Sequence, residues 1–536
     1  MEILEDTTPL LGTMDPQNEA SYDTRHDSQF SGEIIERSAH NIKGIAIGLY
    51  IGSFLCALDI TVVASTMSAI GSAFGASQYA SWIATSYLLT NTAFQPLYGK
   101  MSDIFGRKRA LLFAHFFFAT GCLVCGVSKN MWQLCIGRAI AGIGGGGLAT
   151  MSSVVISDIV SIEDRGIFQG YGNIVFGLGS SLGAPIGGVF AGSIGWRWIF
   201  ISQVPLMLIA TYYVNKHINL PGNVNGGLSK VDFKGSFSLV VGITSLLLGF
   251  SLQTESISFT HPLIIACFAT TVIFLILFVH IEHKVAIEPI VPMRVITKPI
   301  PLLSALINFF MQLALNATVF NFPAFLQIVR GCSISGSGIK LLPLSLSCSV
   351  GSVVCGIVMK KDPKGRYKAL TVWGVGFVTG GVLLVWDMVS RTSVSSSGFW
   401  TEIEMVMGLI GVGLGSGIYL TSCLVGLMMA VHKDDQATAT GISYLFRSVG
   451  SIIGVSVTGI LLQKLLASRI PRVVKDKHLR KMILRNVTLI ATLPDGLKEK
   501  VITVFRKTSG DLFLFVFIFC LFGVLCSLML FKVKSH

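Results

Sequence analysis

The chain is 536 residues long, with 52% hydrophobic and only 13% charged residues. Because soluble domains carry about a quarter charged residues, this composition excludes an ordinary soluble protein and indicates that lipid surrounds much of the chain. The net charge of +13 could suggest a nucleic-acid partner. However, the basic residues lie mostly in short segments between apolar runs, as in the loops of a membrane protein, so we expect no nucleic acid.

The eleven cysteines do not form a disulfide or metal framework. Most lie within apolar runs, where a thiol packs as a small hydrophobic group. Cys122 and Cys125 form a C-x-x-C pair, but no second pair completes a metal site, so we expect no metal. The sequence also lacks the phosphate-binding motif G-x-x-x-x-G-K-[ST] and any catalytic arrangement. We therefore expect neither ATP drive, nor a cofactor, nor enzymatic activity.

Residues 1–43 form a polar and acidic segment without the features of a secretory signal peptide, and we expect them to be a cytosolic tail. Within this tail, Asp6, Leu10 and Leu11 have the D-x-x-x-L-L form of an acidic dileucine sorting signal, to which a sorting adaptor would bind. Such patterns are short and common, so a chance occurrence is the alternative. The first apolar helix must then serve both as insertion signal and as a permanent span.

Fourteen apolar runs follow, each close to the roughly 20 residues that a helix needs to cross the hydrocarbon core. Several are rich in glycine, which lets packed membrane helices approach closely. The runs predict an all-α membrane protein with spans near residues 44–66, 79–98, 110–127, 131–156, 170–192, 199–215, 235–252, 262–280, 302–326, 333–358, 369–387, 403–430, 437–463 and 512–531.

Basic residues gather in the even-numbered loops, from Lys100–Arg109 after the second run to Lys360–Lys368 after the tenth. Cytosolic loops carry an excess of Lys and Arg, so these loops and both termini, including residues 532–536, are predicted to be cytosolic. The count of spans then places the basic segment 466–511 outside the cytosol, where long loops translocate largely regardless of charge. This loop contains a possible glycosylation sequon at Asn486. An amphipathic stretch at the membrane interface is an alternative interpretation of the same segment.

The loop after the second run has the sequence GKMSDIFGRKR. Gly99 and Gly106 allow a tight turn, Asp103 can cap the following helix, and Arg107 and its basic neighbours anchor the cytosolic face. This segment resembles the loop signature G-x-L-x-D-x-x-G-R-[RK] of the major facilitator superfamily, with Met101 in place of the usual Leu. An ordinary basic turn is the alternative.

Two ionisable residues lie within the early spans, where a charge is costly and normally faces a cavity or a partner. Asp59 lies in LDITVV, which resembles the first-helix motif of the fourteen-span drug:proton antiporters, although Ser68 replaces the usual Pro. Arg138, followed by Gly142, resembles the family motif R-x-x-x-G, whose Arg is associated with proton coupling. The resemblance therefore implies proton coupling by Asp59 and Arg138. The alternatives are a structural ion pair or cap for Asp59 and snorkelling of Arg138 to the interface.

The fifth run contains GLGSSLGAPIGG, which resembles the antiporter motif G-P-x-x-G-G with its proline one position late. A closely packed helix without a gating role is the alternative. The candidate gating residues of this run are Gly183, Pro185, Gly187 and Gly188. The sixth run opens with WRWIF, in which Trp196 and Arg197 resemble a signature of fourteen-span antiporters but could also anchor a membrane interface. Residues 434–441 (DDQATATG) and 444–454 (YLFRSVGSIIG) match the same branch.

The resemblance covers about residues 44–465 and implies a major facilitator fold of fourteen helices in a 6+2+6 arrangement. The implied domains are an N-terminal six-helix bundle at 44–220, two linking helices at 221–300, and a C-terminal six-helix bundle at 301–531 that includes the loop 466–511 on the lumenal side. Two homologous bundles around a site at the membrane midplane would work by alternating access.

Polar side chains on single helical faces are candidates to line a substrate cavity. The ninth run has three amides at i, i+4 and i+8, and the second run has a similar i, i+4 pair. Buried amides in lipid must be paired, so hydrogen bonding between helices is the alternative. With Asp59 as the carboxylate for a cationic substrate, the predicted cavity residues are Asp59, Asn91, Gln95, Asn308, Gln312 and Asn316.

The dileucine pattern, the Asp59 motif and LGAPIGG together make the chain similar to fungal vacuolar basic amino-acid transporters. This resemblance implies a monomeric, proton-coupled antiporter of the vacuole membrane that loads lysine, arginine and histidine into the lumen. Two alternatives stay open. One is a plasma-membrane multidrug or siderophore:proton antiporter, and the other is a transporter-like nutrient receptor.

Overall fold

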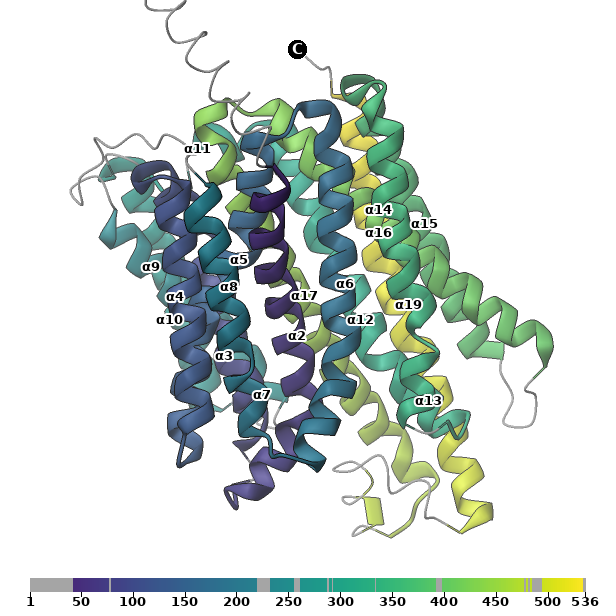
Figure 1. Ribbon diagram of the computed structural model, residues 1–536. Coiled ribbons are helices and arrows are strands. Elements are labelled where there is room, and N and C mark those ends of the chain that lie inside the picture. Colours follow the sequence, from purple (N-terminus) through teal and green to yellow (C-terminus); the bar gives the residue numbers. More distant parts are fainter. Residues whose placement is uncertain are drawn as a thin grey trace, which may run out of the picture.

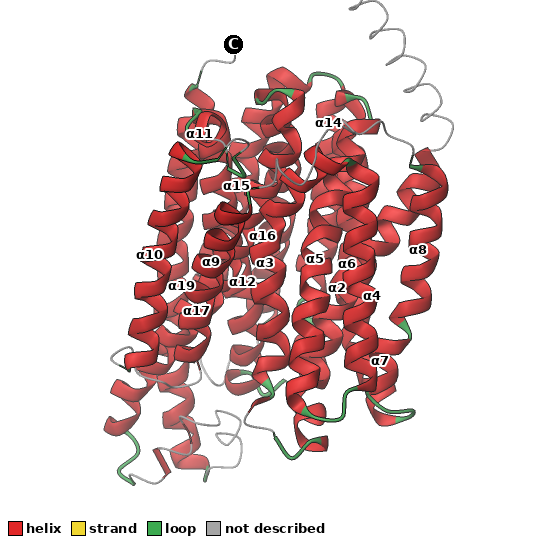
Figure 2. Cartoon of the chain, turned by 90° about the vertical axis from the view of Figure 1, so that its left-hand side faces the viewer, coloured by secondary structure: helices red, strands yellow, loops and turns green. Residues whose placement is uncertain are grey.

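The computed structural model describes residues 42–76, 79–218, 232–254, 261–286, 289–291, 293–332, 334–391, 398–476, 479, 480, 483 and 494–533. Figure 2 shows this part of the chain as helices joined by short loops, without a strand. The predicted sorting signal at Asp6, Leu10 and Leu11 and the sequon at Asn486 lie outside the described residues.

The first seven helices follow the first six predicted spans, and the sixth span is divided into a short helix and a long one. These helices are α2 (Ile42–Ala73), α3 (Ser81–Phe105), α4 (Arg107–Val127), α5 (Met131–Ile159), α6 (Ile162–Gly192), α7 (Arg197–Ile201) and α8 (Gln203–His217).

The remaining helices follow the other eight predicted spans, except for one short helix at Met293–Ile296 that lies in no predicted span. They are α9 (Phe233–Thr254), α10 (Pro262–Lys284), α11 (Met293–Ile296), α12 (Pro299–Val329), α13 (Ile334–Ile339), α14 (Leu342–Lys360), α15 (Pro363–Arg391), α16 (Phe399–Ala430), α17 (Gln436–Arg469) and α19 (Asp495–Lys532), with short 3₁₀ turns at Lys433–Asp435 and Ile470–Arg472.

Thirteen helices of the described residues are long and apolar enough to cross a membrane. This confirms the prediction of an all-α membrane protein. The predicted span at 79–98 coincides with α3, which is not among the thirteen because it carries Asn91, Gln95, Lys100 and Asp103. It is nevertheless 25 residues long, and Figure 1 shows it within the bundle. The count of fourteen spans and their 6+2+6 order stay predictions.

Glycines decide how closely the N-terminal helices approach one another. A methyl group on Gly144 of α5 would lie 2.5 Å from the carbonyl oxygen of Ala114 in α4. One on Gly121 of α4 would lie 2.5 Å from Cα of Ala141 in α5. No Cβ atom fits at these distances, so the backbones of α4 and α5 are in direct contact. The glycine run after Arg138 is therefore a packing surface, as is common between membrane helices.

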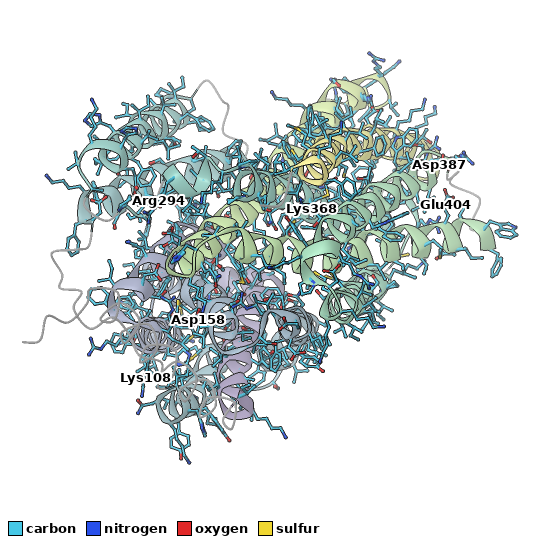
Figure 3. The ribbon with its side chains drawn as sticks, turned by 90° about the horizontal axis from the view of Figure 1, so that it is seen from above. Lys108, Asp158, Arg294, Lys368, Asp387 and Glu404 are labelled. Carbon is cyan, nitrogen blue, oxygen red and sulfur yellow. The ribbon has the colours of Figure 1, made fainter. Side chains whose placement is uncertain are left out.

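Two large clusters of buried apolar side chains divide the helices into two halves. One cluster lies between Ile45 and Ile218 and includes only Ala437 from the later helices. The other lies between Leu303 and Leu530. A smaller cluster joins α9 and α10 to α3 and α17. Seen from above in Figure 3, the N-terminal helices (purple to blue) and the C-terminal helices (green to yellow) form two groups, with the teal helices of α9 and α10 beside them.

The two halves approach most closely at the end where α3 is followed by α4 and α14 by α15, which we call the basic-loop end. It carries the segments Gly99–Arg109 and Lys360–Lys368, predicted as loops, most of whose residues belong to the ends of these helices. A methyl group on Gly166 of α6 would lie 2.7 Å from Cα of Gly356 in α14. Farther along the same two helices, α6 and α14 leave a groove of about 400 Å³ that is lined mostly by apolar residues, together with Ser181 and Ser349. The halves are therefore closed at the basic-loop end, the upper end in Figure 1, and diverge along α6 and α14 away from it.

The loop predicted at 466–511 is shorter than expected at both ends. α17 continues to Arg469, and α19 begins at Asp495. The first turns of α19 are amphipathic, since Ile502 and Phe505 are buried against the C-terminal half while charged residues interrupt the sequence. These charged residues end the apolar run, so composition alone did not predict that this segment is helical.

Substitution of Gly144 by Ala should destabilise the folded protein by about 1–3 kcal/mol, since the added methyl group forces α4 and α5 apart. Gly376→Ala is the matched control, because nothing lies within 4 Å of a methyl group at that helical glycine. The measurement is the temperature at which half of the purified protein loses its monodisperse gel-filtration peak. Equal temperatures for the two variants would contradict the close contact of α4 and α5.

Candidate functional site

A buried ion pair joins the two ionisable residues that the sequence places in the early spans. Arg138 Nη1 of α5 lies 2.6 Å from Asp59 Oδ2 of α2, and the two side chains are 1% and 0% exposed. An arginine held in this way does not reach the membrane interface. The pair therefore argues against the snorkelling alternative for Arg138.

The protein also supplies the other partners of this pair. Gln203 Nε2 donates to Asp59 Oδ1 at 3.3 Å, and Arg138 Nε donates to the carbonyl oxygen of Ile83 at 3.2 Å. The guanidinium lies 4.3 Å from the ring centroid of Tyr87. A buried ion pair is stable only where such additional bonds compensate for lost hydration. A proton on Asp59 would consequently leave Arg138 as a buried charge without a counter-charge.

A chain of hydrogen bonds along α3 leads from this pair to the C-terminal half. Tyr87, Asn91 and Gln95 recur every four residues, so they share one face of α3. Asn91 Nδ2 donates to Tyr87 Oη at 3.5 Å, and Gln95 Nε2 donates to Asn91 Oδ1 at 3.2 Å. Ser448 Oγ of α17 donates to Gln95 Oε1 at 2.9 Å. Two predicted cavity residues, Asn91 and Gln95, therefore lie in a bonded chain that crosses between the halves.

The other three predicted amides lie on α12. Asn308 is 3% exposed and its Nδ2 lies 3.4 Å from Ser443 Oγ of α17, to which it donates. Gln312 is half-buried and accepts a hydrogen bond from Tyr419 Oη at 3.2 Å, and Asn316 donates to the Gln312 carbonyl oxygen at 3.0 Å. Asn308 thus bonds two helices, as the alternative interpretation holds, whereas Gln312 and Asn316 keep the partial exposure that cavity residues need.

Sequence analysis missed polar residues of α5 and α6 that face the other half. The hydroxyl groups of Ser153 and Tyr444 lie 2.6 Å apart. Asn173 Nδ2 of α6 donates to Ser352 Oγ of α14. Gln169, one helical turn before Asn173, donates to it at 3.5 Å. These two amides have the same i, i+4 spacing that singled out Asn91 and Gln95, so the same signal could have found them.

Arg447 of α17 is a second residue that sequence analysis quoted within a motif without giving it a role. It is partly exposed, and it lies between Tyr444 and Ser448, whose side chains both bond the N-terminal half. The structure does not bring Asp59 to this place, since the bonded partners of Asp59 are Arg138 and Gln203. The ion pair and the polar layer between the halves are therefore separate sites.

At the basic-loop end the predicted loop residues form a charged cluster. Arg107 bonds Asp103 and, at 2.7 Å, also Asp158 of α5, which is labelled in Figure 3. Thr438 Oγ1 of α17 donates to Asp103 Oδ2 at 3.0 Å and so joins this cluster to the C-terminal half. The turn expected at Gly106 is confirmed, with a φ of 88° that favours glycine, whereas the turn expected at Gly99 is wrong, because Gly99 lies inside α3. The expected cap is wrong, because Asp103 bonds Arg107 and Thr438 and no side chain caps the start of α4.

The glycine-rich motif of α6 packs against α2 with one of its faces. Gly183 and Gly187 are buried, and a methyl group on Gly187 would lie 2.6 Å from Ser65 Oγ of α2. Pro185 and Gly188 are exposed. The motif therefore divides into a packing face and a face outside the interhelical contact.

The tryptophan–arginine motif holds the connection between α6 and α7. Trp196 is 8% exposed, and its ring packs edge-on against Phe74 with 5.4 Å between the ring centroids. Arg197 Nη2 donates to the carbonyl oxygen of Ser128 at 3.1 Å. Both residues thus tie the far end of the N-terminal half together.

Comparisons with known proteins agree with this arrangement. The family model described as Major Facilitator Superfamily matches residues 49–455. "Multidrug resistance protein fnx1" of Schizosaccharomyces pombe is 39% identical over 497 residues, which cover 91% of this chain and 92% of the relative. "Vacuolar basic amino acid transporter 1" of Saccharomyces cerevisiae is 37% identical over 449 residues, 79% of this chain and 78% of the relative. The solved proton:xylose symporter XylE shares the fold, with 15% identity, a TM-score of 0.57, and coverage of 90% and 95%.

The ion pair between Asp59 and Arg138 should show strong energetic coupling. Asp59→Asn or Arg138→Gln alone should destabilise the protein by about 3–5 kcal/mol, and the double variant should lose much less than the sum. Asp164→Asn with Lys360→Gln is the matched control, since that pair is 38% and 55% exposed and should couple by less than about 1 kcal/mol. Thermal unfolding of all variants in one detergent provides the comparison. Additive losses at Asp59 and Arg138 would contradict the pairing.

Proposed function

Because this chain belongs to the major facilitator superfamily of membrane transporters, we propose that it is a proton-coupled antiporter that moves basic amino acids from the cytosol into the vacuole by alternating access. It is a transporter and not an enzyme. The substrate class is supported by the vacuolar basic amino-acid transporters among its relatives. Lysine, arginine and histidine are the proposed substrates.

The buried ion pair of Asp59 and Arg138 is the observation that best supports the proposed proton coupling. An ionised Asp59 holds α2 to α5 through Arg138, and a protonated Asp59 releases that contact. Since neither side chain is accessible in this conformation, the proton can exchange only after the helices move. A transporter with such a site does not let protons pass without a conformational change.

The proposed cycle starts from the contacts between the halves at the basic-loop end. The bond from Thr438 to Asp103 and the close approach of Gly166 to Gly356 hold this end closed. If the basic-loop end is cytosolic, the conformation described above faces the lumen. Opening the basic-loop end would then admit an amino acid from the cytosol.

The driving force suffices for this scheme. One unit of pH difference supplies about 1.4 kcal/mol for each proton, and 100 mV supplies about 2.3 kcal/mol for each charge. One proton that leaves the acidic lumen down two pH units supports roughly a hundredfold accumulation of a solute in an electroneutral exchange.

The location and topology belong to the same proposal. We place the protein in the vacuole membrane as a monomer, with both termini in the cytosol and with a sorting adaptor bound to the N-terminal tail. The vacuolar relatives support this location.

Multidrug or siderophore export at the plasma membrane is the second candidate function. The 39% identity to a protein named for multidrug resistance favours it, and so does the apolar lining of the groove between α6 and α14. A drug exporter would not need a site for the carboxylate of an amino acid.

Vacuolar vesicles that contain the protein should accumulate labelled lysine, arginine and histidine at least several-fold above vesicles from cells that lack it. The accumulation should require ATP to acidify the vesicles, and a protonophore should abolish it. The measurement is filter-bound radioactivity over time. Equal uptake by both kinds of vesicle, with the protein demonstrated in the membrane, would favour drug export instead.

Asp59→Asn should lower the accumulation of lysine driven by a pH gradient by tenfold or more. Exchange of labelled for unlabelled lysine should continue. The substitution removes the proton acceptor but keeps a polar group of the same shape. Asp164→Asn is the control, because it removes a carboxylate that is 38% exposed at the basic-loop end. The assay uses proteoliposomes with matched amounts of folded protein. Accumulation by the Asp59→Asn variant that still responds to pH would rule out this residue as the proton site.

A further inference from the structure

Arg447 is the single charged residue of α17 between Gln436 and Lys464. It follows the start of the helix by eleven residues. At a rise of about 1.5 Å per residue, it lies roughly 16 Å along the helix, near the middle of a hydrocarbon core about 30 Å thick. Charged side chains at this depth are rare, and they face the interior of the protein, a water-filled cavity or a partner.

The neighbouring residues of α17 define the direction of Arg447. Ser443, four residues earlier, accepts a bond from Asn308 of α12. Tyr444, three residues earlier, bonds Ser153 of α5. Residues three and four apart lie on neighbouring parts of one helical face, so Arg447 lies between the side that packs on α12 and the side that meets the N-terminal half. Its partial exposure therefore opens into the space between the two halves.

The described residues supply no carboxylate as an ion-pair partner for Arg447. Its guanidinium carbon lies 5.0 Å from the ring centroid of Tyr444. The carboxylate of Asp59 is already bound by Arg138. An arginine presents a planar fork of N–H donors that matches a carboxylate in two parallel hydrogen bonds. Arg447 is thus a membrane-embedded cation that is free to receive a carboxylate from outside the protein.

We propose that Arg447 binds the α-carboxylate of the amino-acid substrate, an inference that rests on the proposed function and specifies its binding site. The side-chain ammonium group of the substrate then lies away from Arg447, where the partly exposed Gln312 of α12 offers its side-chain oxygen. Tyr444 and Ser448, which flank Arg447 on α17, bond the N-terminal half, so this site lies where the two halves meet, as a site for alternating access requires.

This assignment makes Arg447 a specificity-determining residue. Every amino acid carries an α-carboxylate, whereas amines without one lack a partner for the guanidinium and are repelled by its charge. The site therefore favours lysine over cadaverine, the amine that differs from lysine only by the missing carboxylate. A cationic drug would meet the same repulsion.

The test measures the binding of lysine and of cadaverine to the purified full-length protein in nanodiscs, by the ligand-induced rise in melting temperature. The native protein should bind lysine at least tenfold more tightly than cadaverine. Arg447→Gln should weaken lysine binding tenfold or more and leave cadaverine binding unchanged or stronger, and Arg447→Lys should restore part of the preference. Arg366→Gln is the control for loss of an arginine, since Arg366 is exposed at the basic-loop end.

Two results would overturn the inference. One is a native protein that binds cadaverine as well as lysine. The other is an Arg447→Gln variant that keeps the preference or loses both ligands equally while it melts normally without ligand. Failure of the proposed function is a different result. If leucine or glutamine binds in place of lysine, and Arg447→Gln weakens that binding tenfold while the matching amine stays unaffected, the carboxylate site stands and only the basic substrate is wrong.

Discussion

A charged side chain inside the membrane needs a counter-charge, hydrogen-bond partners or water, because the hydration that it loses is otherwise uncompensated. This protein meets the demand in two ways. Asp59 and Arg138 satisfy each other within the N-terminal half and are closed to their surroundings. Arg447 has no carboxylate partner among the described residues and faces the space between the halves. A closed pair suits a site that must hold or release a proton in step with a helix movement, whereas an open cation suits a site for a ligand.

Close backbone contact is the second constraint, and it acts where the N-terminal half meets the C-terminal half. Where α6 meets α14, Gly166 and Gly356 let the two helices approach so closely that a side chain on either glycine would force the helices apart. The same holds at Gly99, where a methyl group would lie 2.6 Å from the carbonyl oxygen of Ala437. Such surfaces fit in one arrangement and do not deform gradually. The basic-loop end is therefore either closed with these contacts made or open with them lost.

The sequence predicted those features that depend on composition along one helix. Apolar runs predicted the helices, and the cost of a charge in lipid singled out Asp59 and Arg138. It could not predict that Asp59 lies away from the amides of α12, since that depends on how α2, α5 and α8 pack in space. The early start of α19 at Asp495 was hidden because an amphipathic extension carries too many charges for an apolar run. Arg447 lay inside a recognised motif, but its lack of a carboxylate partner becomes visible only when its neighbours on other helices are known.

α3 is the element that touches all parts of this arrangement. Near one end its Ile83 carbonyl and Tyr87 ring hold Arg138, in the middle Gln95 accepts a bond from Ser448 beside Arg447, and at the basic-loop end Asp103 accepts one from Thr438. Coupling requires that two sites bias the same structural element. A helix held by the ion pair, the polar layer and the closed end cannot shift at one of them without straining the others. Under the proposed function, the polar face that makes α3 the least membrane-like of the predicted spans is what would let one helix connect proton release to substrate access.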